Sequence, residues 1–236
     1  GPASTTHDAA WVMQNEGHGV VQVFACENLS ESRCNSTQQG GSGSVIDLGG
    51  GLVLTNFHVI ADDAASKPLP DLAVGISITG EKIKDAEVVG YSACDDLALL
   101  RITGDVSSFG LSEVAFADPD SVAAGEAVVV LGYPGTIATT NGGDEPLQLT
   151  TGNVSALGVG FENYVDLIQT DAPINHGNSG GPMFDLEGKV IGVASLRDEE
   201  STQGIHYAIS IAQVDKVLPA LKAGKRQDGL TMCPKA

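Results

Sequence analysis

Short hydrophobic runs recur along the chain, separated by glycine-rich or polar turns, and this pattern is typical of an all-β protein. Runs of this kind predict strands at residues 19–24, 44–47, 52–55, 74–79, 82–90, 97–102, 126–131, 147–157, 164–170, 189–195 and 204–209. The runs fall into two groups, one on either side of residue 118, with no long helical pattern between them. Two groups of short strands predict two β-barrels.

Helical periodicity is confined to short segments near the two ends. A capping-box pattern at residues 210–213 precedes apolar residues at helical spacing, which are Ile211, Val214, Val217, Leu218 and Leu221. We therefore predict a short C-terminal helix, and we expect Pro219 to end or kink it. A second short helix is predicted at residues 8–14, around Trp11.

These elements divide the chain into four parts. Residues 1–16 form an N-terminal segment, residues 17–117 the N-terminal barrel, residues 118–221 the C-terminal barrel and residues 222–236 a polar tail. A stretch rich in Asp, Pro, Ser and Ala at residues 117–125 is the predicted linker between the barrels. Gly1-Pro2 resembles the scar of a cleaved tag, so we expect that a targeting segment or anchor was removed.

Composition narrows the range of functions. The net charge of −18 argues against binding to nucleic acid or to anionic membrane surfaces, because both need clusters of Lys and Arg. No apolar run is as long as a membrane span. Acidic clusters at residues 62–63, 118–120 and 198–200 lack the spacing of a calcium loop. We therefore predict neither a metal site nor an organic cofactor.

The four cysteines are Cys26, Cys34, Cys94 and Cys233. They form no CxxC pair, which argues against zinc. Cys26 and Cys34 bracket a polar loop, so a disulfide there would leave Cys94 to hold the C-terminal tail through Cys233. Three connectivities and free thiols stay open at this point. Disulfides would indicate an oxidising compartment.

Three short motifs contain the residue types of a catalytic triad. Ser179 lies in Gly-Asn-Ser-Gly-Gly-Pro, His58 in Thr-Asn-Phe-His-Val and Asp96 in Asp-Asp-Leu-Ala-Leu. The chain order His, Asp, Ser is one of the known triad orders. His58 would act as the base that activates Ser179, and Asp96 would orient the imidazole. Asp95 is the alternative to Asp96, which we prefer because a predicted strand begins directly after it.

The glycines around the serine indicate a second catalytic feature. A candidate oxyanion hole consists of the backbone N–H groups of Gly177, Asn178 and Ser179. The N–H groups of Gly177 and Ser179 are its main predicted donors. The same residues fit the G-x-S-x-G elbow of α/β-hydrolases. That elbow must lead into a helix, and Gly180-Gly181-Pro182 is a poor helix start. We therefore reject the elbow interpretation.

The motifs together resemble the HtrA (Deg) family of trypsin-like serine proteases. The matching segments, which span roughly residues 17–221, are 41–46, 55–59, 96–99, 130–134, 152–157, 170–182 and 191–193. No PDZ-like segment follows them in this sequence. The resemblance implies a chymotrypsin-like double β-barrel of two six-stranded antiparallel barrels. His58 and Asp96 would lie on the first barrel and Ser179 on the second, with substrate in the cleft between them.

The resemblance also implies a specificity pocket formed by Pro173, Ile174, Ala194 and His206. An aspartate at the base of the pocket would select Lys or Arg, but Pro173 stands at that position. We therefore expect a small or medium aliphatic residue on the acyl side of the cleaved bond. Recognition of an acidic side chain by His206 is the alternative.

The sequence thus predicts an extracytoplasmic serine endopeptidase that cleaves proteins or peptides through an acyl-enzyme. The alternative is a latent scaffold with the protease fold that binds a protein partner without cleaving it. HtrA relatives often trimerise through N-terminal aromatic residues, which makes Trp11 a candidate contact in a homo-oligomer. A buried anchor within one monomer is the other interpretation of Trp11.

Overall fold

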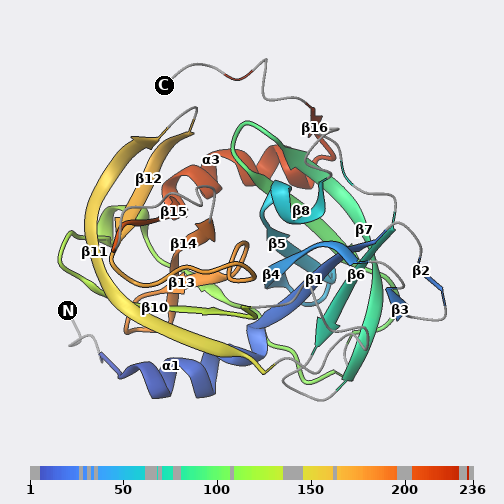
Figure 1. Ribbon diagram of the computed structural model, residues 1–236, viewed down its shortest axis with the longest axis horizontal. Coiled ribbons are helices and arrows are strands. Elements are labelled where there is room, and N and C mark those ends of the chain that lie inside the picture. The colour runs from blue at the N-terminus through green and yellow to red at the C-terminus, as the bar shows by residue number, and fades with distance from the viewer. Residues whose placement is uncertain are drawn as a thin grey trace.

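The computed structural model describes residues 6–26, 29–30, 33–34, 37–61, 68, 71–76, 81–106, 109–134, 146–161, 164–195, 204–228 and 233. Within residues 26–39 and 71–84 it describes the backbone alone. Two β-barrels lie side by side, with helix α1 below the second barrel and helix α3 across the top in the view of Figure 1.

The first sheet has the strand order β16-β7-β6-β1-β4-β5-β8. An additional pairing of β7 with β8 closes six of these strands into a barrel, and β16 joins β7 in parallel. The strands are β1 (Val20–Cys26), β4 (Thr37–Asp47), β5 (Leu52–Thr55), β6 (Asp71–Ile76), β7 (Glu81–Ser92), β8 (Leu97–Ile102) and β16 (Arg226–Gln227). A two-stranded sheet, β2 (Leu29–Ser30) with β3 (Arg33–Cys34), lies between β1 and β4 in the chain.

The second sheet has the order β13-β10-β11-β12-β15-β14-β9. Pairing of β13 with β14 closes this barrel, and β9 joins β14 in parallel. The strands are β9 (Ala115–Phe116), β10 (Ala127–Gly132), β11 (Gln148–Phe161), β12 (Tyr164–Thr170), β13 (Pro182–Phe184), β14 (Lys189–Ser195) and β15 (His206–Ser210). The expected all-β fold of two six-stranded antiparallel barrels is therefore confirmed. Our strand pattern missed β13, because three residues that begin with proline show no alternation.

Among the residues that the structure describes, helical segments are few and short. They are α1 (Ala9–Glu16), α2 (Phe57–Ile60), α3 (Ile211–Lys222) and the 3₁₀ turns η1 (Gly17–Gly19) and η3 (Pro119–Ser121). Asp8 caps α1, since its carboxylate accepts a hydrogen bond from the amide of Trp11 at 2.8 Å. The predicted helix around Trp11 is thus confirmed.

Helix α3 differs from the prediction at its C-terminal end. Pro219 does not end the helix, which continues to Lys222. Packing of the buried side chains of Leu218 and Leu221 holds the last turn. The stop signal is Gly224, whose φ is +82°. Its N–H donates to the carbonyl of Leu221, and the next N–H donates to that of Ala220, which is a Schellman motif.

Strand β8 shows why the segment before Arg101 is apolar without interruption. Alternate side chains of a strand point to opposite faces of the sheet. Ala98 and Leu100 face the core of the first barrel, whereas Leu97 and Leu99 face the second barrel and helix α3. Both faces are buried, so each fully buried leucine contributes about 1.5–3 kcal/mol. This second face forms the seam between the barrels and carries the residues that position the candidate site.

The C-terminal segment is fastened to the first barrel. Part of the predicted tail forms β16, and a disulfide joins Cys94 to Cys233 with their Cα atoms 5.2 Å apart. Cys94 lies in the turn that carries Asp96, so this pair fixes the chain end beside that turn, as predicted. The side chains of Cys26 and Cys34 lie outside the described residues. The predicted domain boundaries remain predictions, although β9 joins the second sheet before residue 118.

Removal of this disulfide is expected to destabilise the protein. The bond closes a loop whose ends are 139 residues apart, and loss of such a bond lowers the free energy of unfolding by about 2–5 kcal/mol. Replacing both Cys94 and Cys233 with serine avoids a lone thiol. Denaturant unfolding of the double variant and of the oxidised wild type measures the difference. Equal midpoints would contradict the prediction.

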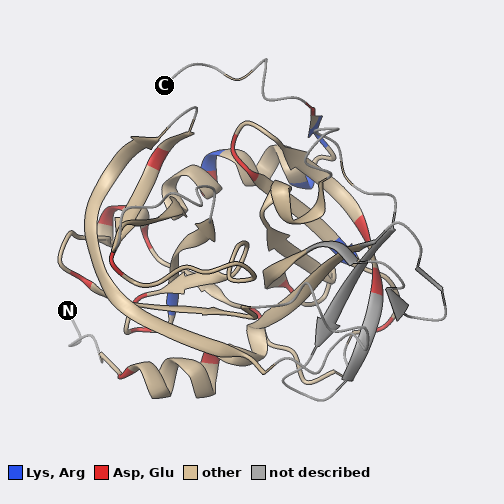
Figure 2. Cartoon of the chain, in the orientation of Figure 1, with Lys and Arg blue, Asp and Glu red and all other residues tan. Residues whose placement is uncertain are grey.

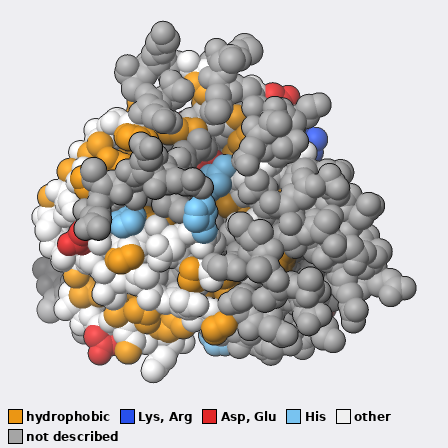
Figure 3. Space-filling model, in the orientation of Figure 1, with side chains coloured by type: hydrophobic (Ala, Val, Ile, Leu, Met, Phe, Trp, Pro, Cys, Tyr) orange, Lys and Arg blue, Asp and Glu red, His pale blue; other side chains and the backbone are white. Residues whose placement is uncertain are grey.

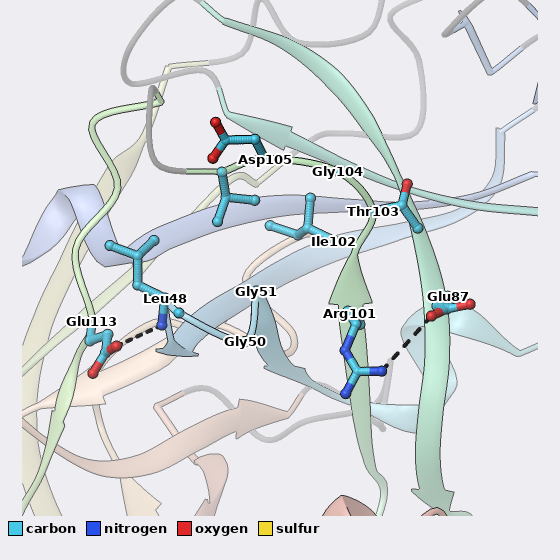
Figure 4. A pocket seen from close by; sticks show the side chains of 12 residues that line it. Leu48, Gly50, Gly51, Glu87, Arg101, Ile102, Thr103, Gly104, Asp105 and Glu113 are labelled. Carbon is cyan, nitrogen blue, oxygen red and sulfur yellow. Dashed lines mark hydrogen bonds and ion pairs between the residues drawn. The ribbon is translucent and has the colours of Figure 1, made fainter.

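A hollow of ≈ 750 Å³ lies on the first barrel, lined in part by Leu48, Arg101, Ile102 and Glu113. Figure 4 shows Glu113 reaching the amide of Leu48, at 2.7 Å, and Arg101 facing Glu87. The hollow lies where β5 begins and β8 ends. The candidate triad residues His58 and Asp96 lie at the opposite ends of these two strands, so the hollow is separate from them.

Acidic positions are spread over both barrels, with few basic positions among them (Figure 2). This distribution agrees with the net charge of −18. None of the helices that the structure describes is both long and apolar enough to cross a bilayer.

Candidate active site

His58 and Asp96 are in direct contact. His58 lies in α2, the helical turn that follows β5, and Asp96 lies in the turn that precedes β8. Nδ1 of His58 is 2.9 Å from Oδ2 of Asp96 and 3.1 Å from Oδ1. An ionised carboxylate only accepts hydrogen bonds, so Nδ1 carries the hydrogen and Nε2 of a neutral ring is left as an acceptor.

The backbone holds this pair in place. The amide of His58 donates to Oδ1 of Asp96 at 3.0 Å. The carbonyl of Asp96 accepts from the amide of Phe57 at 3.1 Å and from the side chain of Asn56 at 2.9 Å. Asp96 adopts a φ of +53°, a left-handed conformation that aspartate tolerates better than most residues. The turn is therefore built around Asp96, and His58 is oriented by two separate hydrogen bonds to its carboxylate.

Asp96 is completely buried, so its carboxylate needs hydrogen-bond donors. Ser195, at the end of β14, supplies a further one: its Oγ donates to Oδ2 of Asp96 at 3.0 Å. Ser195 was missed at the sequence level, where the only available signal was a polar residue ending an apolar strand. Asp95 points elsewhere, since it accepts hydrogen bonds from Ser92 and, at 2.7 Å, from Gln213. The contact with His58 therefore belongs to Asp96.

Ser179 lies in the loop between β12 and β13, and this loop abuts the first barrel. The carbonyl of Ser179 accepts from the amide of Ser42 at 2.8 Å. Gly180 has a φ of +84°, and a Cβ there would lie 2.2 Å from the carbonyl oxygen of Ser42 and 2.3 Å from Oγ1 of Thr55. No side chain fits at Gly180, which explains the glycine. The segment after Gly180 leads into β13 and not into a helix. A hydrolase elbow must lead into a helix, so the structure agrees with our rejection of that interpretation.

Gly41 links the serine loop to the helical turn that carries His58. A Cβ at Gly41 would lie 2.7 Å from the carbonyl oxygen of Ser179 and 2.7 Å from a methyl group of Val59. Ser179 and the residue after His58 thus approach the same glycine of β4. The Ser179 loop therefore lies beside the helical turn that carries His58, whose ring contacts Asp96. The face in Figure 3 carries histidine side chains near its centre, among hydrophobic and uncharged ones.

The loop before Ser179 forms a tight turn. The amide of Asn178 donates to the carbonyl of Asn175 at 3.0 Å, and Gly177, the third residue of the turn, has a φ of +97°. These are the features of a type II turn, which differs from a type I turn by a flip of its central peptide. The turn therefore sets the direction of the Gly177 N–H. The turn also uses the N–H of Asn178, which donates to the carbonyl of Asn175. The sequence predicted this N–H group as an oxyanion donor.

The four residues predicted for the specificity pocket have different surroundings. Ile174 and Ala194 are buried in one apolar cluster of the second barrel. Pro173 is exposed, and its carbonyl accepts from the hydroxyl of Thr150 at 2.7 Å. His206 begins β15 and is half-buried, and its Nδ1 has no hydrogen-bond partner within the described structure. Burial lowers the pKa of His206, so its ring is neutral at pH 7.

Residues 41–193 match the model of the trypsin-like peptidase domain. The chain belongs to the trypsin-like peptidase family. The matched segment includes His58, Asp96 and Ser179. Among the described residues, no three His, Cys, Asp or Glu side chains gather as metal ligands would.

Curated relatives of the family confirm the resemblance to HtrA (Deg) proteases. The chain is 37% identical over 174 residues to the periplasmic serine endoprotease DegP of Salmonella typhimurium, covering 72% of this chain and 33% of that protein. It is 38% identical over 195 residues to a probable periplasmic serine endoprotease, DegP-like, of Brucella suis, covering 80% of this chain and 34% of the relative. The chain thus spans about a third of the length of these curated relatives.

A solved structure of the family has a similar fold. The serine endoprotease from Yersinia pestis matches with a TM-score of 0.71 and 27% sequence identity. The match covers 93% of this chain and 68% of that one. This chain therefore shares its double-barrel fold with the Yersinia pestis protein.

Proposed function

We propose that this chain is a serine endopeptidase that hydrolyses peptide bonds through an acyl-enzyme. The observation that carries the proposal is the buried Asp96 carboxylate on Nδ1 of His58, at 2.9 Å, beside the loop of Ser179. This contact holds the ring in the tautomer whose Nε2 can accept a proton. Positioned proton transfer of this kind contributes about 10²–10⁴-fold to rate.

The proposed reaction has two steps, with the proton carried by His58. In the first, Nε2 takes the Ser179 proton as Oγ attacks the peptide carbonyl, and the protonated ring then gives this proton to the leaving amine. In the second, a water molecule gives a proton to Nε2 and attacks the ester, and the protonated ring gives this proton to the departing Oγ, which releases the acid and restores Ser179. Asp96 stays ionised throughout and stabilises the imidazolium that forms in each step.

The oxyanion of each intermediate would be bound by the N–H groups of Gly177 and Ser179. The type II turn at residues 175–178 supports this assignment, because φ of +97° at Gly177 keeps the central peptide in one of its two orientations. Each such donor is worth about 10²–10³-fold in rate. The amide of Asn178 would instead hold the turn together.

We further propose that Pro173, Ile174, Ala194 and His206 border the pocket for the residue on the acyl side of the cleaved bond. The burial of Ile174 and Ala194 in one apolar cluster supports a preference for small or medium aliphatic side chains. A neutral ring at His206 lacks the charge that would attract a carboxylate. The substrates would be proteins or peptides outside the cytoplasm, as the names of the periplasmic relatives indicate for those proteins.

A fluorophosphonate that reacts with activated serines tests the proposal. We expect the pure protein to be labelled at Ser179, as mapped by mass spectrometry of its peptides, and to cleave members of a peptide library. Labelling requires the proton acceptor and the oxyanion donors, whereas a latent scaffold would provide neither in working form. Absence of both labelling and cleavage would contradict the proposal and favour the scaffold.

A further inference from the structure

Ser42 of β4 connects the serine loop to both barrels through four hydrogen bonds. Its Oγ donates to the carbonyl of Gly177 at 2.6 Å and accepts from the amide of Tyr133 at 3.0 Å. Its amide donates to the carbonyl of Ser179 at 2.8 Å, and its carbonyl accepts from the hydroxyl of Thr55 at 2.7 Å. Ser42 is completely buried. No solvent competes for these bonds, so each one restricts the loop.

The contact with Gly177 fixes one peptide group of the oxyanion turn on both sides. The peptide between Gly177 and Asn178 has its carbonyl held by Ser42 and its N–H held by the carbonyl of Asn175. The orientation of the preceding peptide, which carries the Gly177 N–H, then depends on the two backbone torsion angles of Gly177, whose φ is +97°. The carbonyl of Ser179 is also held by Ser42, so the peptides on both sides of the Ser179 N–H group are anchored.

We propose that Ser42 is a positioning residue for catalysis: its hydroxyl keeps the turn at residues 175–178 in the form that aims the Gly177 and Ser179 N–H groups at the substrate carbonyl. This inference rests on the proposed peptidase function. Glycine permits both signs of φ, so Gly177 has little preference of its own for the form with φ of +97°. The Ser42 hydroxyl restrains the turn from the other barrel, because it fixes the Gly177 carbonyl.

Ser44 offers a matched control on the same strand. It lies two residues from Ser42, so both side chains are on one face of β4, and it is 2% exposed. Its Oγ has no hydrogen-bond partner in the part of the chain that the structure describes. Serine-to-alanine changes at Ser42 and Ser44 therefore remove the same atom from buried positions on the same face of one strand. Only the change at Ser42 removes a contact with the serine loop.

The experiment compares Ser42→Ala and Ser44→Ala in the full chain, with steady-state cleavage of one peptide and inhibition by a peptide aldehyde of the same sequence. The aldehyde forms a hemiacetal whose oxygen occupies the oxyanion position. For Ser42→Ala we expect kcat to fall about 10- to 100-fold, below the 10²–10³-fold that follows outright loss of a donor. Inhibition by the aldehyde should weaken by a similar factor to the loss of kcat. KM should change less than about twofold, because the lost contact acts on the transition state. Ser44→Ala should match the wild type.

Thermal unfolding of both variants separates a positioning role from a role in stability. A purely structural role would lower the melting temperature but would leave the ratio of the aldehyde inhibition constant to KM unchanged. A folded Ser42→Ala variant with the kcat of Ser44→Ala would overturn the inference. A wild type that neither cleaves peptides nor reacts with fluorophosphonate would instead refute the proposed function. If Ser42→Ala does not fold, the pair Ser42→Cys and Ser44→Cys makes the same comparison, because a thiol is a weaker donor.

Discussion

Replacing Ser179 with alanine is expected to lower kcat by on the order of 10⁶-fold, the loss found when the nucleophile of a triad is removed. The change deletes the only atom that can form the acyl-enzyme. The fold should persist, because the Ser179 carbonyl, which alanine keeps, accepts a hydrogen bond from the amide of Ser42 in the first barrel. Cleavage of a fluorogenic peptide measures the loss, and circular dichroism measures the fold.

Ser155→Ala is a suitable control for this experiment. Ser155 is exposed on β11, so the change removes a hydroxyl without touching the site. Both variants are purified in the same way, so a contaminating protease would contribute equally to cleavage by the two. Wild-type activity in Ser179→Ala would show that another residue is the nucleophile. Fluorophosphonate labelling should disappear from Ser179→Ala and persist in Ser155→Ala.

The candidate catalytic motifs could be recognised in the sequence because triad chemistry restricts the sequence locally. His58, Asp96 and Ser179 each lie within a short segment. In each segment, neighbouring glycines or apolar strand residues are also needed to position the side chain. Strands such as 97–102 and 164–170 were predicted with their observed ends, because polar residues flank both runs. Local patterning therefore gave most of the barrels and all three triad candidates.

The supporting residues were not predictable from local pattern. Ser42 and Ser195 act through hydrogen bonds to segments 135 and 99 residues away, and a single serine in a strand gives no sign of such a partner. The amide of Asn178 was misassigned because its use in the turn depends on the conformation of Gly177. Of the two effects expected of Pro219, it does not end α3, because the packing of Leu218 and Leu221 outweighs its local effect. For Ser42, Ser195 and α3, the deciding contacts are between segments that sequence periodicity treats separately.

Asp96→Asn is expected to lower kcat by about 10⁴-fold, as loss of the corresponding carboxylate does in other triads. An asparagine side chain has one acceptor oxygen, whereas the Asp96 carboxylate accepts from the His58 amide, from Nδ1 of His58 and from Ser195. If the amide nitrogen faces Nδ1, the ring must carry its hydrogen on Nε2. The ring then cannot accept the Ser179 proton, so acylation slows. Nitrogen-15 NMR of the His58 ring would report this change of tautomer.

Asp95→Asn is the matched control, because it removes the same charge from the adjacent residue. Asp95 accepts hydrogen bonds from Ser92 and Gln213, and an asparagine oxygen can still accept the second of these. We expect kcat of Asp95→Asn to stay within a few-fold of the wild type and the His58 tautomer to be unchanged. Equal losses in both variants would mean that the turn before β8, and not the Asp96 carboxylate, supports activity. A large loss in Asp96→Asn alone assigns the effect to the carboxylate that contacts His58.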